Sequence, residues 1–139
     1  MKVKEILKLD SKFNFEAKLM NASSKTGSNL GLSQVEQLDL QKILIGEKSE
    51  MMIVRVCGQS MIEKNINDGD LLIVESTTDA KQGDVVIASL NGELTVKTLM
   101  YENGKPILEA ANKQFFPIEI GEFYQFEIQG IVRHVIKHI

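Results

Sequence analysis

The sequence predicts a mostly β fold: a compact antiparallel sheet or partial barrel with one short N-terminal helix and a flexible N-terminal arm. Many short β-rich runs follow one another between residues 51 and 136, with turn residues at regular spacing. Two Asn-Gly pairs, at 91–92 and 103–104, are the strongest short hairpin signals in the chain. With 139 residues, 43% of them hydrophobic, the chain is long enough for one domain with its own core.

The expected organisation is an N-terminal arm and linker over residues 1–32 and a folded domain over residues 33–139. Residues 21–29 are small, polar and rich in turn formers, which is typical of an exposed linker that a protease can enter. Residues 1–26 carry a net charge of +3, and residues 27–139 carry −6. This acidity argues against direct binding to the DNA backbone.

A helix is expected at the start of the domain. Ser33 and Glu36 form a capping box, in which the serine caps the first turn and the glutamate follows three residues later. Gly46 is the predicted end of this helix. Its apolar positions are Val35, Leu38, Ile43 and Leu44.

The remaining elements alternate strands with turns. A strand over 51–57 ends at Gly58, and Ser60 to Ile66 can form a short helix. Asn91-Gly92 suits a type I′ hairpin turn, and Asn103-Gly104 predicts a second hairpin. The other expected elements are turns at 67–70 and 81–84 and strands at 71–74, 85–88, 93–100, 106–110 and 124–136, the last of them interrupted at Gly130.

Ser60 and Lys97 are the candidate catalytic pair. Ser60 lies between a strand and a helical turn, where backbone amides can stabilise an oxyanion, although a serine after a turn is more often a simple helix cap. Strand alternation places Lys97 on one face with Thr95 and Leu99, and an exposed strand lysine is the common interpretation. A lysine can activate a serine hydroxyl only if burial makes its amine neutral.

Other reactive residues have simpler interpretations. Cys57 is the only cysteine, which excludes an internal disulfide and a multi-cysteine metal site. His134 and His138 lie on an alternating stretch with no third ligand in sight and are expected at the surface. Three aspartates in turn sequences are expected to shape turns rather than bind metal. We therefore expect no metal or cofactor; the aspartates are Asp68, Asp70 and Asp84.

No apolar run approaches the roughly 20 residues of a membrane span. Residues 1–9 alternate lysines with aliphatic residues and lack the continuous apolar core of a signal peptide. We expect a cytoplasmic protein that does not contact membranes.

In their order and spacing, five segments of the chain resemble the LexA/UmuD family of self-cleaving serine peptidases, and the UmuD branch most closely. The resemblance covers about residues 33–139. The segments are Val-Cys-Gly-Gln-Ser-Met-Ile at 56–62, Ile-Asn-Asp-Gly-Asp-Leu-Leu-Ile-Val at 66–74, Gly-Asp-Val-Val-Ile-Ala at 83–88, Glu-Leu-Thr-Val-Lys at 93–97 and Gly-Ile-Val at 130–132.

The resemblance implies a Ser–Lys dyad, with Ser60 as the nucleophile and Lys97 as the general base. It further implies a β-rich fold, a homodimer, and self-cleavage stimulated by the RecA–single-stranded DNA filament during the SOS response. The shortened product of a UmuD-like protein partners a UmuC-like translesion polymerase. The expected cut lies between Thr26 and Gly27, where the family usually has alanine or cysteine before the glycine; Leu30-Gly31 is a bulkier alternative.

Two other functions stay open. The chain could be a family member that no longer cuts and acts as a dimeric binding module for a polymerase or repressor; the intact Ser60 and Lys97 oppose this, and Thr26 favours it. It could also be a signal-peptidase-like enzyme acting on other chains, which the absence of a membrane anchor opposes.

Overall fold

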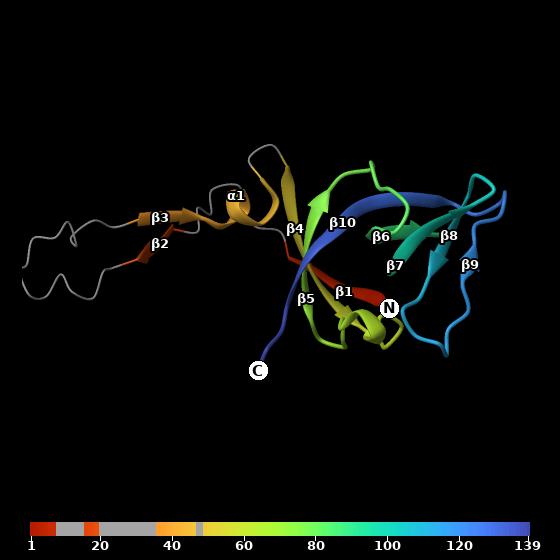
Figure 1. Ribbon diagram of the computed structural model, residues 1–139, viewed down its shortest axis with the longest axis horizontal. Coiled ribbons are helices and arrows are strands. Elements are labelled where there is room, and N and C mark those ends of the chain that lie inside the picture. The colour runs from red at the N-terminus through yellow and green to blue at the C-terminus, as the bar shows by residue number, and fades with distance from the viewer. Residues whose placement is uncertain (8–15, 20–35, 47–48) are drawn as a thin grey trace, which may run out of the picture.

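The computed structural model describes residues 1–7, 16–19, 36–46 and 49–139. The predicted mostly β class is confirmed: the main sheet is antiparallel throughout, and the α-helix of the described part is the six-residue α1 (Leu40–Ile45). Figure 1 shows the strands wrapped into one body, with a separate two-stranded ribbon projecting from it. No helix in the described ranges is long and apolar enough to cross a membrane.

Six strands close into a barrel. Each neighbouring pair is antiparallel, and the ring closes because β1 pairs with both β4 and β7. Two further strands, β8 (Lys105–Glu109) and β9 (Ile118–Glu119), extend the sheet beyond β7. In spatial order the barrel strands are β1 (Lys2–Leu7), β4 (Glu50–Cys57), β5 (Leu71–Ser76), β10 (Phe126–Ile136), β6 (Val85–Leu90) and β7 (Glu93–Glu102).

The presence of β1 in the barrel was not expected, because its residues belong to the predicted arm. Its pairing with β4 runs from Lys2 opposite Cys57 to Leu7 opposite Ile53. The division of the chain at residues 32 and 33 stays a prediction, but residues 1–7 lie within the folded body (Figure 1).

Two apolar clusters form the core, and strand alternation divides the residues between them. On β6, Ile87 belongs to one cluster, whereas Val86 and Ala88 belong to the other. Successive side chains of a strand point to opposite faces, so β6 contributes to both. The first cluster is the one beside the candidate catalytic pair, and it includes Met1, Val54, Val56, Met61, Leu72, Val74 and Val96.

Both predicted Asn-Gly hairpins are confirmed. Asn91 and Gly92 have φ angles of 50° and 86°, and they join β6 to β7. Asn103 and Gly104 have φ angles of 52° and 77°, and they join β7 to β8. Positive φ at both central residues defines the type I′ turn, which only asparagine, aspartate and glycine adopt readily.

The predicted helix is wrong over residues 36–39. These residues form β3 (Glu36–Asp39), which pairs with β2 (Glu16–Leu19) in the projecting ribbon. The backbone ladder between two distant segments has overridden the local capping pattern, because helix propensity is a weak preference. The helix ends at Gly46, as predicted, with φ of 96°. Ser33 and Val35 lie outside the described residues.

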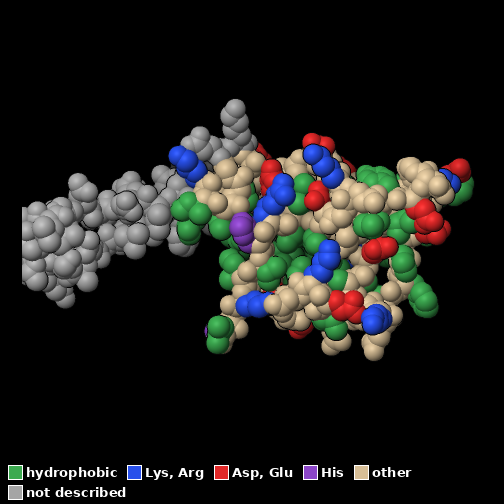
Figure 2. Space-filling view, in the orientation of Figure 1, with side chains coloured by type: hydrophobic (Ala, Val, Ile, Leu, Met, Phe, Trp, Pro, Cys, Tyr) green, Lys and Arg blue, Asp and Glu red, His purple; other side chains and the backbone are tan. Residues whose placement is uncertain are grey.

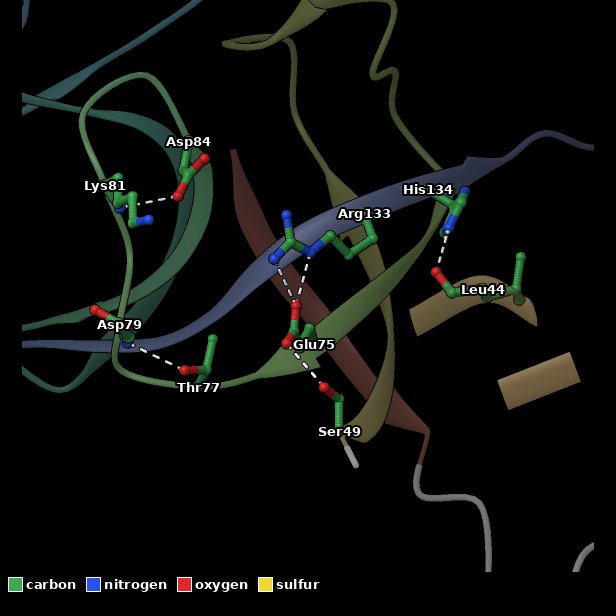
Figure 3. Close-up of polar contacts among 9 residues, drawn as sticks. All are labelled: Leu44, Ser49, Glu75, Thr77, Asp79, Lys81, Asp84, Arg133 and His134. Carbon is green, nitrogen blue, oxygen red and sulfur yellow. Dashed lines mark hydrogen bonds and ion pairs between the residues drawn. The ribbon is translucent and has the colours of Figure 1, made fainter. Parts of the chain in front are cut away.

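Polar side chains connect β5 and β10 to each other and to segments beside them. Figure 3 shows the Glu75 carboxylate between Arg133 and Ser49; it accepts hydrogen bonds of 2.7 Å from Arg133 Nε and 2.9 Å from Ser49 Oγ. These two donors lower the pKa of Glu75. The exposed His134 ring lies 2.7 Å from the Leu44 carbonyl and so connects β10 to α1 (Figure 3). Its surface position agrees with the sequence prediction.

Gly130 is required by packing rather than by backbone conformation. A Cβ atom built there would lie 2.5 Å from Val74 Cγ1 and 2.6 Å from the Glu75 carbonyl oxygen. We expect Gly130→Ala to lower the free energy of unfolding by about 3 kcal/mol, as overpacking against backbone typically does. Urea unfolding measures this, with Gly121→Ala as the control, because Gly121 has no positive φ and a Cβ there would lie 4.0 Å from Tyr124 Cε2. Equal stability of Gly130→Ala and the wild type would contradict the close approach.

Candidate active site

The turn after β4 holds Ser60. Gly58 ends the strand with φ of 104°, and its N–H donates a 2.8 Å hydrogen bond to Asp68 Oδ1. A side chain is strained at this φ, so glycine is the residue that reverses the chain here. Ser60 itself has no exposed surface. The candidate nucleophile is therefore enclosed by the protein rather than presented on an open loop.

Contacts from the segment that joins β8 to β9 fix the turn. The side chain of Asn112, which is buried, donates a 2.9 Å hydrogen bond from Nδ2 to the Gln59 carbonyl. The N–H of Glu63 donates a 2.8 Å hydrogen bond to the Ala111 carbonyl. The predicted short helix after Ser60 is a single 3-10 turn, Ile62–Lys64. Together these bonds hold the backbone on both sides of Ser60.

Lys97 lies on β7 and points at Ser60. Its Nζ is 2.7 Å from Ser60 Oγ, and the contact is buried. Only 6% of the Lys97 surface is exposed, so the alternative of an exposed strand lysine is wrong. The register places Lys97 opposite Val86 of β6, in the middle of the barrel wall. Strands far apart in the sequence thus bring the two predicted residues together.

Burial lowers the pKa of Lys97, and the contact with the α-amino group of Met1 opposes this lowering more weakly. Burial favours the neutral amine because the charged form loses hydration. A neutral amine carries the lone pair that a base needs. The arrangement can therefore take a proton from the Ser60 hydroxyl.

The sequence profile of the Peptidase S24-like family matches residues 18–133, which is most of the chain. This chain belongs to the Peptidase S24-like family. The S24 match extends over every strand of the barrel except β1 and the last residues of β10.

Curated relatives of this S24 chain include several LexA repressors. That of Psychromonas ingrahamii is 46% identical over 86 residues, which are 61% of this chain and 41% of the relative. That of Syntrophotalea carbinolica is 36% identical over 101 residues, 73% of this chain and 50% of the relative. That of Mannheimia succiniciproducens is 41% identical over 88 residues, 62% of this chain and 41% of the relative. The matched part thus spans half or less of each relative's length.

One further group lies at this site without any signal in the sequence, the α-amino group of Met1. It contacts Ser60 Oγ directly. Burial, together with the neighbouring Lys97, lowers the pKa of this amine to about 5. It is therefore uncharged at neutral pH. Two amines can approach one hydroxyl only if they are not both charged, because like charges repel strongly where water is excluded.

The three aspartates have the predicted turn roles. Asp68 accepts from Gly58, Asp70 Oδ2 accepts a 2.8 Å hydrogen bond from the Asn67 N–H, and Asp84 Oδ2 accepts one of 2.8 Å from the Lys81 N–H (Figure 3 shows the last). Among the described residues, no three His, Cys, Asp or Glu side chains are arranged to hold a metal ion. Cys57 is half-buried and free.

The predicted cleavage site falls in a part of the chain that the structure does not describe. Thr26, Gly27 and the alternative Gly31 fall outside the described residues. The candidate cut between Thr26 and Gly27 therefore stays a prediction from the sequence.

Proposed function

We propose that this chain is a self-cleaving serine peptidase of the UmuD type, with Ser60 as the nucleophile and Lys97 as the general base. The single observation that carries the proposal is the buried 2.7 Å contact between Lys97 Nζ and Ser60 Oγ. A nucleophile within hydrogen-bond reach of a base is the arrangement that covalent catalysis needs. The lowered pKa of Lys97 supports its role as the base.

In the proposed reaction, neutral Lys97 accepts the hydroxyl proton of Ser60, and Oγ attacks the carbonyl carbon of Thr26. The N–H of Ser60 donates to no partner within the described ranges, so it is available to the developing oxyanion. Lys97 then transfers its proton to the amide nitrogen of Gly27, and the bond between Thr26 and Gly27 breaks. Water hydrolyses the resulting acyl-enzyme and releases the serine.

The substrate is part of the same chain, so the reaction rate depends on the fraction of linkers docked at Ser60. An activator needs only to stabilise that docked state. We infer that the RecA–single-stranded DNA filament plays this part, as expected for a UmuD-like protein of the SOS response. The remaining expectations belong to the same proposal: a cytoplasmic homodimer whose shortened form partners a UmuC-like translesion polymerase.

Direct DNA binding is not part of this proposal. Residues 27–139 carry a net charge of −6. On the face shown in Figure 2, lysine and arginine side chains are interspersed with acidic ones and form no continuous basic surface. A phosphate backbone binds best to such a continuous surface.

A second candidate is the peptidase part of a LexA-type repressor. It is favoured by the 46% identity to the LexA repressor of Psychromonas ingrahamii. The two candidates differ in what the product does. Capture of a UmuC-like polymerase by the cleaved chain but not by the uncleaved chain supports the first. Loss of sequence-specific DNA binding on cleavage supports the second.

The cut site provides the test of the proposed function. Incubation with the RecA–single-stranded DNA filament is expected to produce a fragment that starts at Gly27, detected by intact mass and N-terminal sequencing. Thr26→Ala should accelerate cleavage, because threonine is bulkier and stiffer than the small residue usual in the family. Gly27→Glu should block it by adding bulk and charge at the scissile bond. A fragment with another N-terminus would contradict this site but not the dyad.

A further inference from the structure

The strand β1 lies directly against the Ser60 turn. Lys2 is the Cα partner of Cys57 on β4 and also of Thr95 on β7. The first residues of the chain thus fill the space between the strand that leads to Ser60 and the strand that carries Lys97. Figure 1 shows the N-terminus ending inside the body, beside β7.

Met1 occupies the position next to the nucleophile. Its carbonyl oxygen accepts a 2.9 Å hydrogen bond from the Val96 N–H and another of 2.9 Å from Thr95 Oγ1. Its side chain is 7% exposed and packs in the core cluster that contains Met61. Its α-amino group contacts Ser60 Oγ. Backbone, side chain and amine are therefore all held at the site.

The nitrogen of Met1 occupies the space beside the candidate nucleophile. A peptide bond that Ser60 attacks must place its carbonyl carbon against Oγ, with the leaving nitrogen attached to that carbon. The Met1 nitrogen lies against Oγ, and the rest of β1 runs away from it. No peptide carbonyl can reach Ser60 while this nitrogen remains there.

The attachment of β1 is suited to release. Its ion pairs, Arg55 with Glu5 at 3.6 Å and Lys2 with Glu93 at 3.8 Å, are exposed and contribute little. Its register with β4 also shifts between Val3 and Glu5, which interrupts the ladder. Only Met1 among residues 1–7 is fully buried.

We propose that residues 1–7 are an internal inhibitor that occupies the space beside Ser60, and that β1 must leave before the cleavage linker can dock. This inference rests on the proposed self-cleavage. Residues 1–7 are then a second segment of the same chain, and they compete with the cleavage linker for the space beside Ser60. Self-cleavage is then limited by the fraction of molecules in which β1 is released.

A disulfide between β1 and β4 tests the proposal in the full chain. Directly opposed residues of antiparallel strands have Cβ atoms close enough for a disulfide. Lys2→Cys places a thiol opposite the native and only cysteine, Cys57. After oxidation with diamide, this variant should cleave itself at least about tenfold more slowly than after reduction with dithiothreitol, since the released fraction falls. Lys4→Cys, which has no register partner, is the matched control and should cleave equally in both states.

A second readout does not depend on self-cleavage. A small fluorophosphonate that acylates reactive serines should label Ser60 faster in reduced than in oxidised Lys2→Cys. Failure of the disulfide to form would overturn the placement of β1. Equal cleavage and equal labelling in both states would overturn its inhibitory role. If the reduced protein is labelled at Ser60 but never cleaves itself, the proposed function fails. The difference in labelling between the reduced and oxidised states then decides this inference alone.

Discussion

Replacing Lys97 with methionine is expected to lower the rate of self-cleavage by about 10² to 10⁴, the usual contribution of a general base. Ser60→Ala is expected to abolish it, because no other group can form the acyl intermediate. Both residues are buried and in contact at 2.7 Å. Methionine retains most of the length and volume of lysine, so the variant removes the amine and little else. Intact mass after incubation at alkaline pH measures the rate.

Matched controls separate chemistry from stability. Lys105→Met is the control for Lys97→Met, because Lys105 is an exposed lysine on the neighbouring strand β8. Ser76→Ala is the control for Ser60→Ala, because Ser76 is an exposed serine of β5. Both should cleave like the wild type. Thermal unfolding of the Ser60 and Lys97 variants should show a single cooperative transition. Continued cleavage by either folded variant at the wild-type rate would refute the dyad.

The rate of self-cleavage is expected to rise about tenfold per pH unit below the pKa of Lys97 in the folded protein and to level off above it. The sign follows from which form reacts: only the neutral amine accepts the Ser60 proton, and protons are lost as the pH rises. Burial lowers this pKa, so the plateau should begin below the ordinary pKa of lysine. High pH should therefore partly replace the RecA filament.

The measurement is the initial rate across a pH series, with circular dichroism at each pH to establish that the chain stays folded. Lys97→Met should lose the dependence along with most of the rate. A flat profile from neutral to strongly alkaline pH, in folded wild-type protein, is incompatible with a lysine base. A slope that survives in Lys97→Met would assign the titration to another group.

Local residue chemistry was enough to predict much of this protein. Asn91-Gly92 and Asn103-Gly104 determine their hairpins because few other residues accept positive φ at both positions. Asp70 and Asp84 accept hydrogen bonds from the backbone N–H three residues earlier, so their roles are also local. Ser60 and Lys97 are candidates because the ordered motifs around them, which the sequence displays directly, resemble those of a self-cleaving peptidase family.

Contacts between distant segments decided the rest. Residues 36–39 carry a helix-start pattern yet pair with β2, since a tertiary ladder outweighs local propensity. Lys97 alternates like a surface residue, but the strands around it remove it from water and shift its pKa. The strand β1 has no sequence signal for its place beside Ser60. Its position follows only from the edge of β4 opposite β5 and the part of β7 before its pairing with β8, whose backbone groups need partners that the barrel does not otherwise supply.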